Sequence, residues 1–261
     1  MCGRYMIVTV PEAMRRLFGY LEQPNFPPRY NIAPTQPIPI VRLAEGRRQF
    51  ALARWGLIPA WVEDPRRFSL LINARADTVN DKPAFRAAMK RRRCLIPADG
   101  FYEWKEEGGR KRPFFVYPRA GGPVAFAGLW ETWTGPNGEE METAAIITTD
   151  ACRSLQAIHH RMPVVVPPDA FDVWLDCAHV DAETATALLV PAPDGLFAAH
   201  EVSQAVNRTA NDGPAVIAPL PPQPASAEAV DGVAVAPAPP TAAPPAKPRA
   251  RKQDERQTSL F

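Results

Sequence analysis

Two segments, Val124–Trp133 (VAFAGLWETW) and Glu142–Thr149 (ETAAIITT), decide the fold that this sequence predicts. Both are rich in aromatic and β-branched residues, which favour β-strands. Gly135-Pro136-Asn137-Gly138 lies between them and is typical of a turn. The sequence therefore predicts two long strands that follow each other directly through a turn.

Similar strand-like segments continue along the chain in both directions. Further strands are expected over 38–43, 49–57, 95–104, 113–117, 162–166 and 197–202. Short helices are expected to start at Pro11 and to cover 83–92, 152–158, 168–175 and 183–189. Because the strands come in runs and do not alternate with long helices, we predict an α+β fold. Its bent, mainly antiparallel sheets would form a barrel-like core with short helices around it.

The composition divides the chain of 261 residues into three parts. Residues 1–218 have the apolar content of a packed domain. Residues 219–252 alternate proline and alanine with almost no large apolar side chain, which predicts a disordered linker. Residues 253–261 form a C-terminal peptide that ends in apolar residues.

Several function classes are disfavoured by what the sequence lacks. The first ten residues have neither the basic segment nor the long apolar run of a signal peptide, and no stretch approaches the roughly 20 apolar residues of a membrane span. The four cysteines show no metal-ligand spacing. We therefore expect a cytoplasmic protein with free thiols, without a metal, a cofactor or a membrane contact.

Cys2 follows the initiator methionine directly. A small residue in second place usually allows Met1 to be removed, which would leave a cysteine with a free α-amine and a thiol. Such an aminothiol can condense with an aldehyde to an imine and then close to a thiazolidine ring. It can also act as an N-terminal nucleophile with its own amine as the base. The alternative is that Cys2 merely begins a strand or a mobile terminus.

Four polar segments interrupt the apolar strands, at 72–77, 99–104, 148–150 and 159–163. Each contains a residue with catalytic potential and an ordinary structural explanation. Asn73 could hold a buried loop, Glu103 could pair with a nearby cation, and His159 could be a structural histidine. Taken singly, these side chains favour the structural explanation.

Six motifs, taken together, resemble the SOS response-associated peptidase family. They are, in order, Met1–Tyr5, Tyr30–Thr35, Arg54–Pro59, Asn73–Asp77, Gly100–Trp104 and His159–Pro163, and the resemblance covers essentially residues 2–217. The resemblance implies a protein that shields abasic sites in single-stranded DNA through a crosslink to its N-terminal cysteine. It also implies that Cys2, Asn73, Glu103 and His159 form the reactive set. The His-x-Arg-Met-Pro spacing of the family favours His159 over His160.

The residue types suit the chemistry that the resemblance implies. A histidine can move the protons that open the abasic sugar to its aldehyde. The Cys2 amine can attack this aldehyde, and a protonated Glu103 can assist the loss of water. Asn73 can orient the terminus or the sugar. Ring closure by the thiol then gives a stable, slowly reversible adduct before strand cleavage.

Contacts to DNA are expected from basic and aromatic residues. Arg4, Arg75 and Arg161 lie inside the reactive motifs and are candidates for phosphate contacts. Trp55, Trp61 and Pro39 are candidates for stacking on bases or separating them, and Thr148 is placed with the DNA contacts. The other basic clusters are as consistent with a solvated surface as with a DNA track. We expect the protein to act as a monomer and to associate with the nucleoid when bound to DNA.

The last five residues, QTSLF, resemble the peptide that binds the bacterial sliding clamp. Gln257, Leu260 and Phe261 would be its anchors, and a tether of this kind raises the local concentration of the protein at its partner. The alternative is an unstructured tail that happens to end in Leu-Phe.

Two other functions stay open on the sequence. Cys2 and His159 could be the nucleophile and base of a thiol peptidase or hydrolase, and the family resemblance itself implies removal of Met1, whether autocatalytic or by an aminopeptidase. A lyase activity stays open as well. The second alternative is a non-covalent module for single-stranded DNA, in which Cys2 is incidental.

Overall fold

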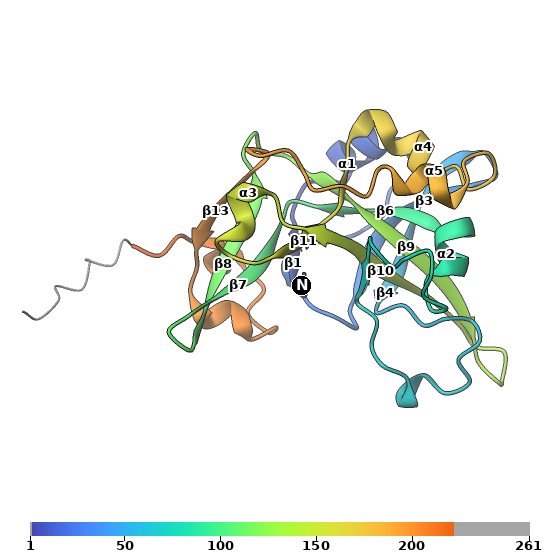
Figure 1. The fold of residues 1–261 in the computed structure, drawn as a ribbon, viewed down its shortest axis with the longest axis horizontal. Coiled ribbons are helices and arrows are strands. Elements are labelled where there is room, and N and C mark those ends of the chain that lie inside the picture. The colour runs from blue at the N-terminus through green and yellow to red at the C-terminus, as the bar shows by residue number, and fades with distance from the viewer. Residues whose placement is uncertain (1, 222–261) are drawn as a thin grey trace, which may run out of the picture. The chain divides into compact units, whose positions relative to one another are not determined.

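The computed structural model describes residues 2–221, which form a single compact unit (Figure 1). All but the first three residues of the expected linker lie outside this range, as does the whole C-terminal peptide. The expected α+β fold with mainly antiparallel sheets is confirmed. Strands build two sheets, and short helices lie around them.

Five strands of the larger sheet close into a ring. In order around it they are β10 (Glu140–Asp150), β4 (Arg47–Trp55), β3 (Pro37–Ala44), β6 (Arg93–Ala98) and β9 (Val124–Thr134), and β9 pairs again with β10. The pairing of β10 with β4 is parallel, and the other four are antiparallel. The ring is the barrel-like core that the runs of strands predicted.

The long hairpin of β9 and β10 forms an extended antiparallel pair in this barrel. The strands pair from Thr134 with Glu140 to Gly128 with Ile146, and the turn between them is closed by a hydrogen bond from the Gly138 amide to the Gly135 carbonyl at 3.0 Å. A side chain at Gly128 would come within 2.8 Å of both Ile96 and Cys94, so the barrel needs a glycine there.

A second, entirely antiparallel sheet packs beside the barrel. Its order is β13 (Phe197–Glu201), β8 (Arg110–Pro118), β7 (Gly100–Glu107), β1 (Tyr5–Ile7) and β2 (Arg29–Ile32). The first strand of the chain therefore lies inside a sheet, between β7 and β2. This placement fixes the start of the chain at the junction of the two sheets (Figure 1).

The expected single strand over 95–104 is wrong, because the chain turns a corner at Asp99. The Asp99 carboxylate accepts hydrogen bonds from the amides of Val8 and Thr9 at 2.6 and 2.7 Å, and its own amide donates to Met6. A side chain at Gly100 would lie 2.6 Å from the Phe115 ring. These constraints end β6 in the barrel and start β7 in the second sheet.

The end of β10 leaves the barrel and gains new neighbours on both sides. Strand β5 (Asn73–Arg75) pairs with it in parallel, and β11 (Arg161–Pro163) pairs with it antiparallel. The expected strand over 162–166 is divided, since β12 (Val165–Val166) pairs with β9 instead. This three-stranded extension brings two of the polar segments, 72–77 and 159–163, to one place.

The helices are short and peripheral, as expected. The α-helices are α1 (Pro11–Phe18), α2 (Arg86–Arg91), α3 (Arg153–Gln156), α4 (Phe171–Leu175) and α5 (Ala182–Thr186). The 3-10 turns are η1 (Pro65–Arg67), η2 (Pro168–Ala170), η3 (Gln204–Asn207) and η4 (Pro214–Ile217). Figure 1 shows α1, α4 and α5 together along one side of the molecule. Within residues 2–221, none of these helices has the length and apolar character to cross a membrane.

Candidate active site at the chain start

Cys2 is fully buried where the chain enters β1. Its carbonyl oxygen accepts a hydrogen bond from Nδ2 of Asn73 at 2.8 Å, and its Sγ lies 3.9 Å from the Arg4 carbonyl oxygen. Burial raises the pKa of the Cys2 thiol far above its usual range, and the nearby Glu103 carboxylate raises it further. The thiol is therefore held in its protonated form.

Asn73 begins β5 and connects the chain start to the extension of β10. Its Nδ2 donates to the Cys2 carbonyl oxygen, but its Oδ1 is buried and has no hydrogen-bond partner among the described residues. A buried acceptor without a partner costs free energy, so such an atom is expected to bind a donor during function. The amide can thus hold Cys2 on one side and a substrate donor on the other.

Glu103 lies on β7, opposite Phe114 of β8, and is buried. Burial disfavours the ionised carboxylate and raises the pKa of Glu103 to about 7. Its Oε1 lies 4.0 Å from Nδ1 of His159. At neutral pH this carboxyl group exists in both protonation states, which is what a group that gives and takes protons needs.

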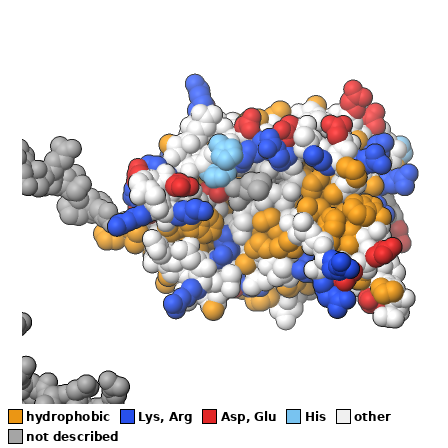
Figure 2. Space-filling model, turned by 60° about the horizontal axis from the view of Figure 1, so that its bottom comes forward, with side chains coloured by type: hydrophobic (Ala, Val, Ile, Leu, Met, Phe, Trp, Pro, Cys, Tyr) orange, Lys and Arg blue, Asp and Glu red, His pale blue; other side chains and the backbone are white. Residues whose placement is uncertain are grey.

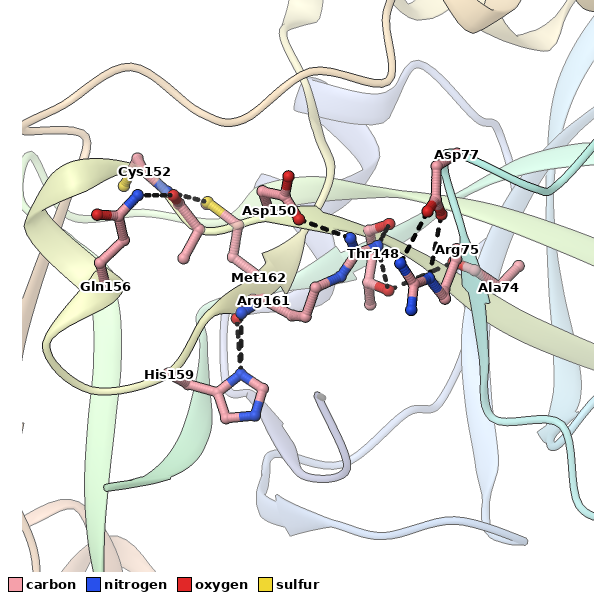
Figure 3. Close-up of polar contacts among 11 residues, drawn as sticks. Ala74, Arg75, Asp77, Thr148, Asp150, Cys152, Gln156, His159, Arg161 and Met162 are labelled. Carbon is pink, nitrogen blue, oxygen red and sulfur yellow. Dashed lines mark hydrogen bonds and ion pairs between the residues drawn. The ribbon is translucent and has the colours of Figure 1, made fainter. Parts of the chain in front are cut away.

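His159 lies between α3 and β11 with its ring fixed by the backbone. Its Nδ1 lies 3.0 Å from the Arg161 amide nitrogen and 3.2 Å from the Arg161 carbonyl oxygen (Figure 3). Burial lowers the pKa of His159, which favours the neutral ring. His159, Glu103 and Arg161 line one small cavity of about 10 Å³. The reactive set that the resemblance implied is therefore gathered in one place.

Arg161 and Thr148 support this site from behind. The Arg161 guanidinium is buried, pairs with Asp150 at 2.8 Å and donates to the Thr148 carbonyl at 2.5 Å (Figure 3). Thr148 is also buried, and its hydroxyl donates to Ala74 at 3.4 Å. These contacts tie β11, β10 and β5 together. Phosphate contacts by Arg161 and Thr148 stay a prediction, and their side chains have structural partners in this conformation.

Three other expected DNA contacts are buried or half-buried. Trp55 is fully buried, and its indole donates to the Ile72 carbonyl at 3.0 Å. Pro39 is a buried residue of β3. The half-buried Arg4 donates to Oδ1 of Asn31 at 2.8 Å and to the Val206 carbonyl at 2.7 Å. In this conformation the three side chains hold the fold rather than present a surface.

Two expected DNA contacts do reach the surface. The Arg75 side chain is 58% exposed and pairs with Asp77 at 2.7 Å. Trp61 is 60% exposed and packs edge to face on Phe68. Phe68 also lines an open cavity of about 360 Å³ together with Arg54. Figure 2 shows hydrophobic and basic side chains next to one another on one face, together with histidine and acidic side chains.

Asn31 is a supporting residue that the sequence reasoning quoted but did not assign. It is fully buried, and its Nδ2 donates to the carbonyls of Val206, Arg208 and Asn211. Because its Oδ1 accepts from Arg4, it ties the last turns of the domain to the chain start. An asparagine inside an apolar strand was the signal, since a buried amide must find partners.

The described residues contain no group of three or more histidine, cysteine or acidic side chains placed to hold a metal ion. All four cysteines are free thiols.

The family model of the SOS response associated peptidase (SRAP) matches residues 1–209. The chain belongs to this family. Curated relatives include the abasic site processing protein YoqW of Bacillus subtilis, 35% identical over 83% of this chain and 99% of that protein. The abasic site processing protein HMCES of Gallus gallus is 32% identical over 84% of this chain and 78% of its own length.

Solved structures of similar chains support the same fold. A protein from Bacteroides thetaiotaomicron superposes with a TM-score of 0.75 at 26% identity, over 84% of this chain and all of its own. A phage-related protein from Bordetella bronchiseptica gives 0.63 at 30% identity, over 78% of this chain and 95% of its own. The two-sheet architecture thus recurs in chains with quite different sequences.

The raised pKa of Glu103 predicts how stability depends on pH. Glu103 binds its proton more tightly in the folded than in the unfolded state, so its contribution to stability is complete below about pH 4.5 and is lost as the pH rises through about 7. Glu103→Gln keeps the neutral shape at every pH. Relative to the unmodified protein, we expect this variant to gain about 3 kcal/mol in free energy of unfolding between pH 4.5 and 8.

Urea unfolding at several pH values measures this difference, with the exposed Glu106 as the matched control. Glu106→Gln should follow the unmodified protein throughout. A constant difference between the Glu103→Gln variant and the unmodified protein would contradict a raised pKa at Glu103.

Proposed function

We propose that this protein captures abasic sites in single-stranded DNA by forming a thiazolidine between Cys2 and the open-chain sugar. The observation that carries the proposal is the hydrogen bond that holds Cys2 through Asn73 beside a buried carboxyl group and an imidazole. The names of the curated relatives, abasic site processing proteins, support this substrate. The adduct would shield the lesion from strand cleavage and from error-prone repair.

The first step is removal of Met1, because the reactive group is the α-amine of Cys2 together with its thiol. Hydrolysis of the Met1–Cys2 peptide bond frees this amine, either by the protein itself or by an aminopeptidase. A free α-amine has a pKa of about 7.7–8.0, so a useful fraction is unprotonated at neutral pH. Since the neighbouring thiol is held protonated by burial, the amine is the first nucleophile.

The second step is condensation with the sugar aldehyde. An abasic sugar is mostly ring-closed, and opening it requires a proton to move from the hydroxyl on C1′ to the ring oxygen. His159 is suited to this transfer because the Arg161 amide holds its Nδ1 and its lowered pKa favours the neutral ring, which can accept a proton. The Cys2 amine then adds to C1′ and gives a carbinolamine.

The third step is loss of water and closure of the ring. Glu103 in its protonated form gives a proton to the departing hydroxyl, which leaves as water, and the resulting carboxylate takes the nitrogen proton, so that the neutral imine forms. The Cys2 sulfur then bonds to the imine carbon, and the thiol proton ends on the nitrogen. Closure removes the imine, so that β-elimination and strand cleavage do not follow. The buried site excludes bulk water, which makes reversal slow.

Cys2→Ala is expected to abolish the covalent product on abasic single-stranded DNA, because both the thiol and ring closure are lost. Insertion of one alanine between Met1 and Cys2 should be as damaging, because the amine is then separated from the thiol. A denaturing gel and the intact mass measure both results. The mass of the adduct should be that of protein plus DNA minus one water.

The matched control is Cys152→Ala, which removes a buried thiol outside the site. This variant should crosslink as the unmodified protein does. Turnover of a peptide by the mature protein without a DNA adduct would favour the thiol peptidase instead. Equal, purely non-covalent binding of intact and abasic DNA would favour the binding module.

We propose that the exposed face beside the site guides the flanking DNA. Arg75 is a candidate for a phosphate contact, since the pair that it makes with Asp77 is exposed and easily exchanged. Trp61 offers an exposed ring to a base. Arg75→Ala should lower the slope of log affinity against log salt by about one for undamaged single strands. An unchanged slope would remove Arg75 from the phosphate contacts, and the exposed Arg110, on the β7–β8 hairpin, serves as the matched control.

The C-terminal peptide is proposed to bind the bacterial sliding clamp through Gln257, Leu260 and Phe261. A tethered anchor would raise the concentration of the protein at replicating DNA without changing its reaction. Deletion of residues 257–261 should abolish capture by immobilised clamp and leave the crosslink to free abasic DNA unchanged. Retained capture would contradict this role.

A further inference from the structure

His160 stacks on the site without belonging to the reactive set. The ring centroids of His159 and His160 lie 4.4 Å apart, and the two planes are inclined by 28°. His160 itself is exposed, and its carbonyl oxygen accepts a hydrogen bond from the Ala151 amide at 2.9 Å. The backbone therefore fixes the residue while its ring covers one face of His159.

We propose that His160 is a positioning residue that fixes the orientation and the protonation state of His159. The Arg161 amide holds the edge of the His159 ring at Nδ1, and the His160 ring covers one of its faces. An edge contact and a face contact together leave the imidazole little freedom to rotate, which keeps Nε2 turned toward the substrate. The effect of His160 on the crosslinking reaction rests on the proposed function, whereas its effect on the His159 ring does not.

The charge of His160 also affects His159, because it favours the neutral form of the His159 ring. Two imidazolium ions at this separation repel each other, so protonation of His160 opposes protonation of His159. The pKa of His159 is lowered first by burial, and both His160 and Arg161 add to this effect through their charges. The exposed ring thus keeps the buried ring neutral down to a lower pH.

The other charged groups facing His159 come from three directions. Glu103 approaches from β7 at 4.0 Å and favours the protonated ring. Arg161 on β11 and the positive charge of the chain terminus beside Cys2 oppose it. Glu103 belongs to the reactive set, and Arg161 holds His159 and ties β11 to β10. His160 can be replaced without removing any of these contacts.

The test is the titration of His159 in the free protein, followed by NMR through its ring C2–H signal. Four histidines occur in the chain, and the signal is assigned by its loss in His159→Gln. His160→Phe keeps an aromatic face but removes the charge, and it should raise the His159 midpoint by about half a unit. His160→Ala should raise it as well and broaden the signal, because the ring regains freedom. The exposed His179, paired with Asp176, is the matched control.

The crosslinking reaction gives a second readout. The acid limb of the rate of adduct formation should move to higher pH by the same amount in His160→Phe, with the rate at the optimum within about twofold. His160→Ala should also lower that optimum rate several-fold. An unmoved His159 midpoint in His160→Phe would overturn the proposal. Because the titration needs no DNA, it stands or falls separately from the proposed crosslink.

Discussion

The backbone hydrogen bonds along β10 are the constraint on which the site depends. Over its first part this strand closes the barrel between β9 and β4, and over its last part it pairs with β5 and β11. One strand thereby joins the most rigid part of the molecule to the two segments that carry Asn73 and His159. A displacement of β10 by one residue would turn its buried side chains outward, so the barrel core fixes the register of the site as well.

The second sheet carries the other two residues of the site, Cys2 and Glu103. Its strand β1 follows three residues after the buried Cys2, and the neighbouring central strand β7 carries Glu103. Burial then acts on the two ionisable partners in opposite directions, raising the pKa of the carboxyl group and lowering that of the imidazole. Both shifts favour the neutral forms, and the shift of Glu103 brings its carboxyl group into the range where protons are exchanged near neutral pH. Burial also keeps the Cys2 thiol protonated.

The sequence predicted the strands better than the corners between them, and it placed in its motifs the residues that the structure brings together around Cys2. Long apolar segments such as Val124–Trp133 define strands by their composition, whatever surrounds them. The corner at Asp99 was missed because its cause is a distant pairing with Val8 and Thr9, which local composition does not contain. The burial of Trp55 is likewise a property of the closed barrel, and an isolated tryptophan in a strand says nothing of which side it faces.

The residues of the motif His159–Pro163 differ in what their side chains contact. His159 and Arg161 both line the small cavity, and Arg161 and Met162 also hold this segment in place by different means. The Arg161 amide fixes the imidazole, its guanidinium ties β11 to β10, and the sulfur of Met162 accepts the Cys152 amide at 3.4 Å. A short run of polar residues in such a motif therefore does not imply that each contacts the substrate. The burial of Arg161 explains why a charged residue can accompany a catalytic histidine and yet serve mainly to keep its backbone donor in place.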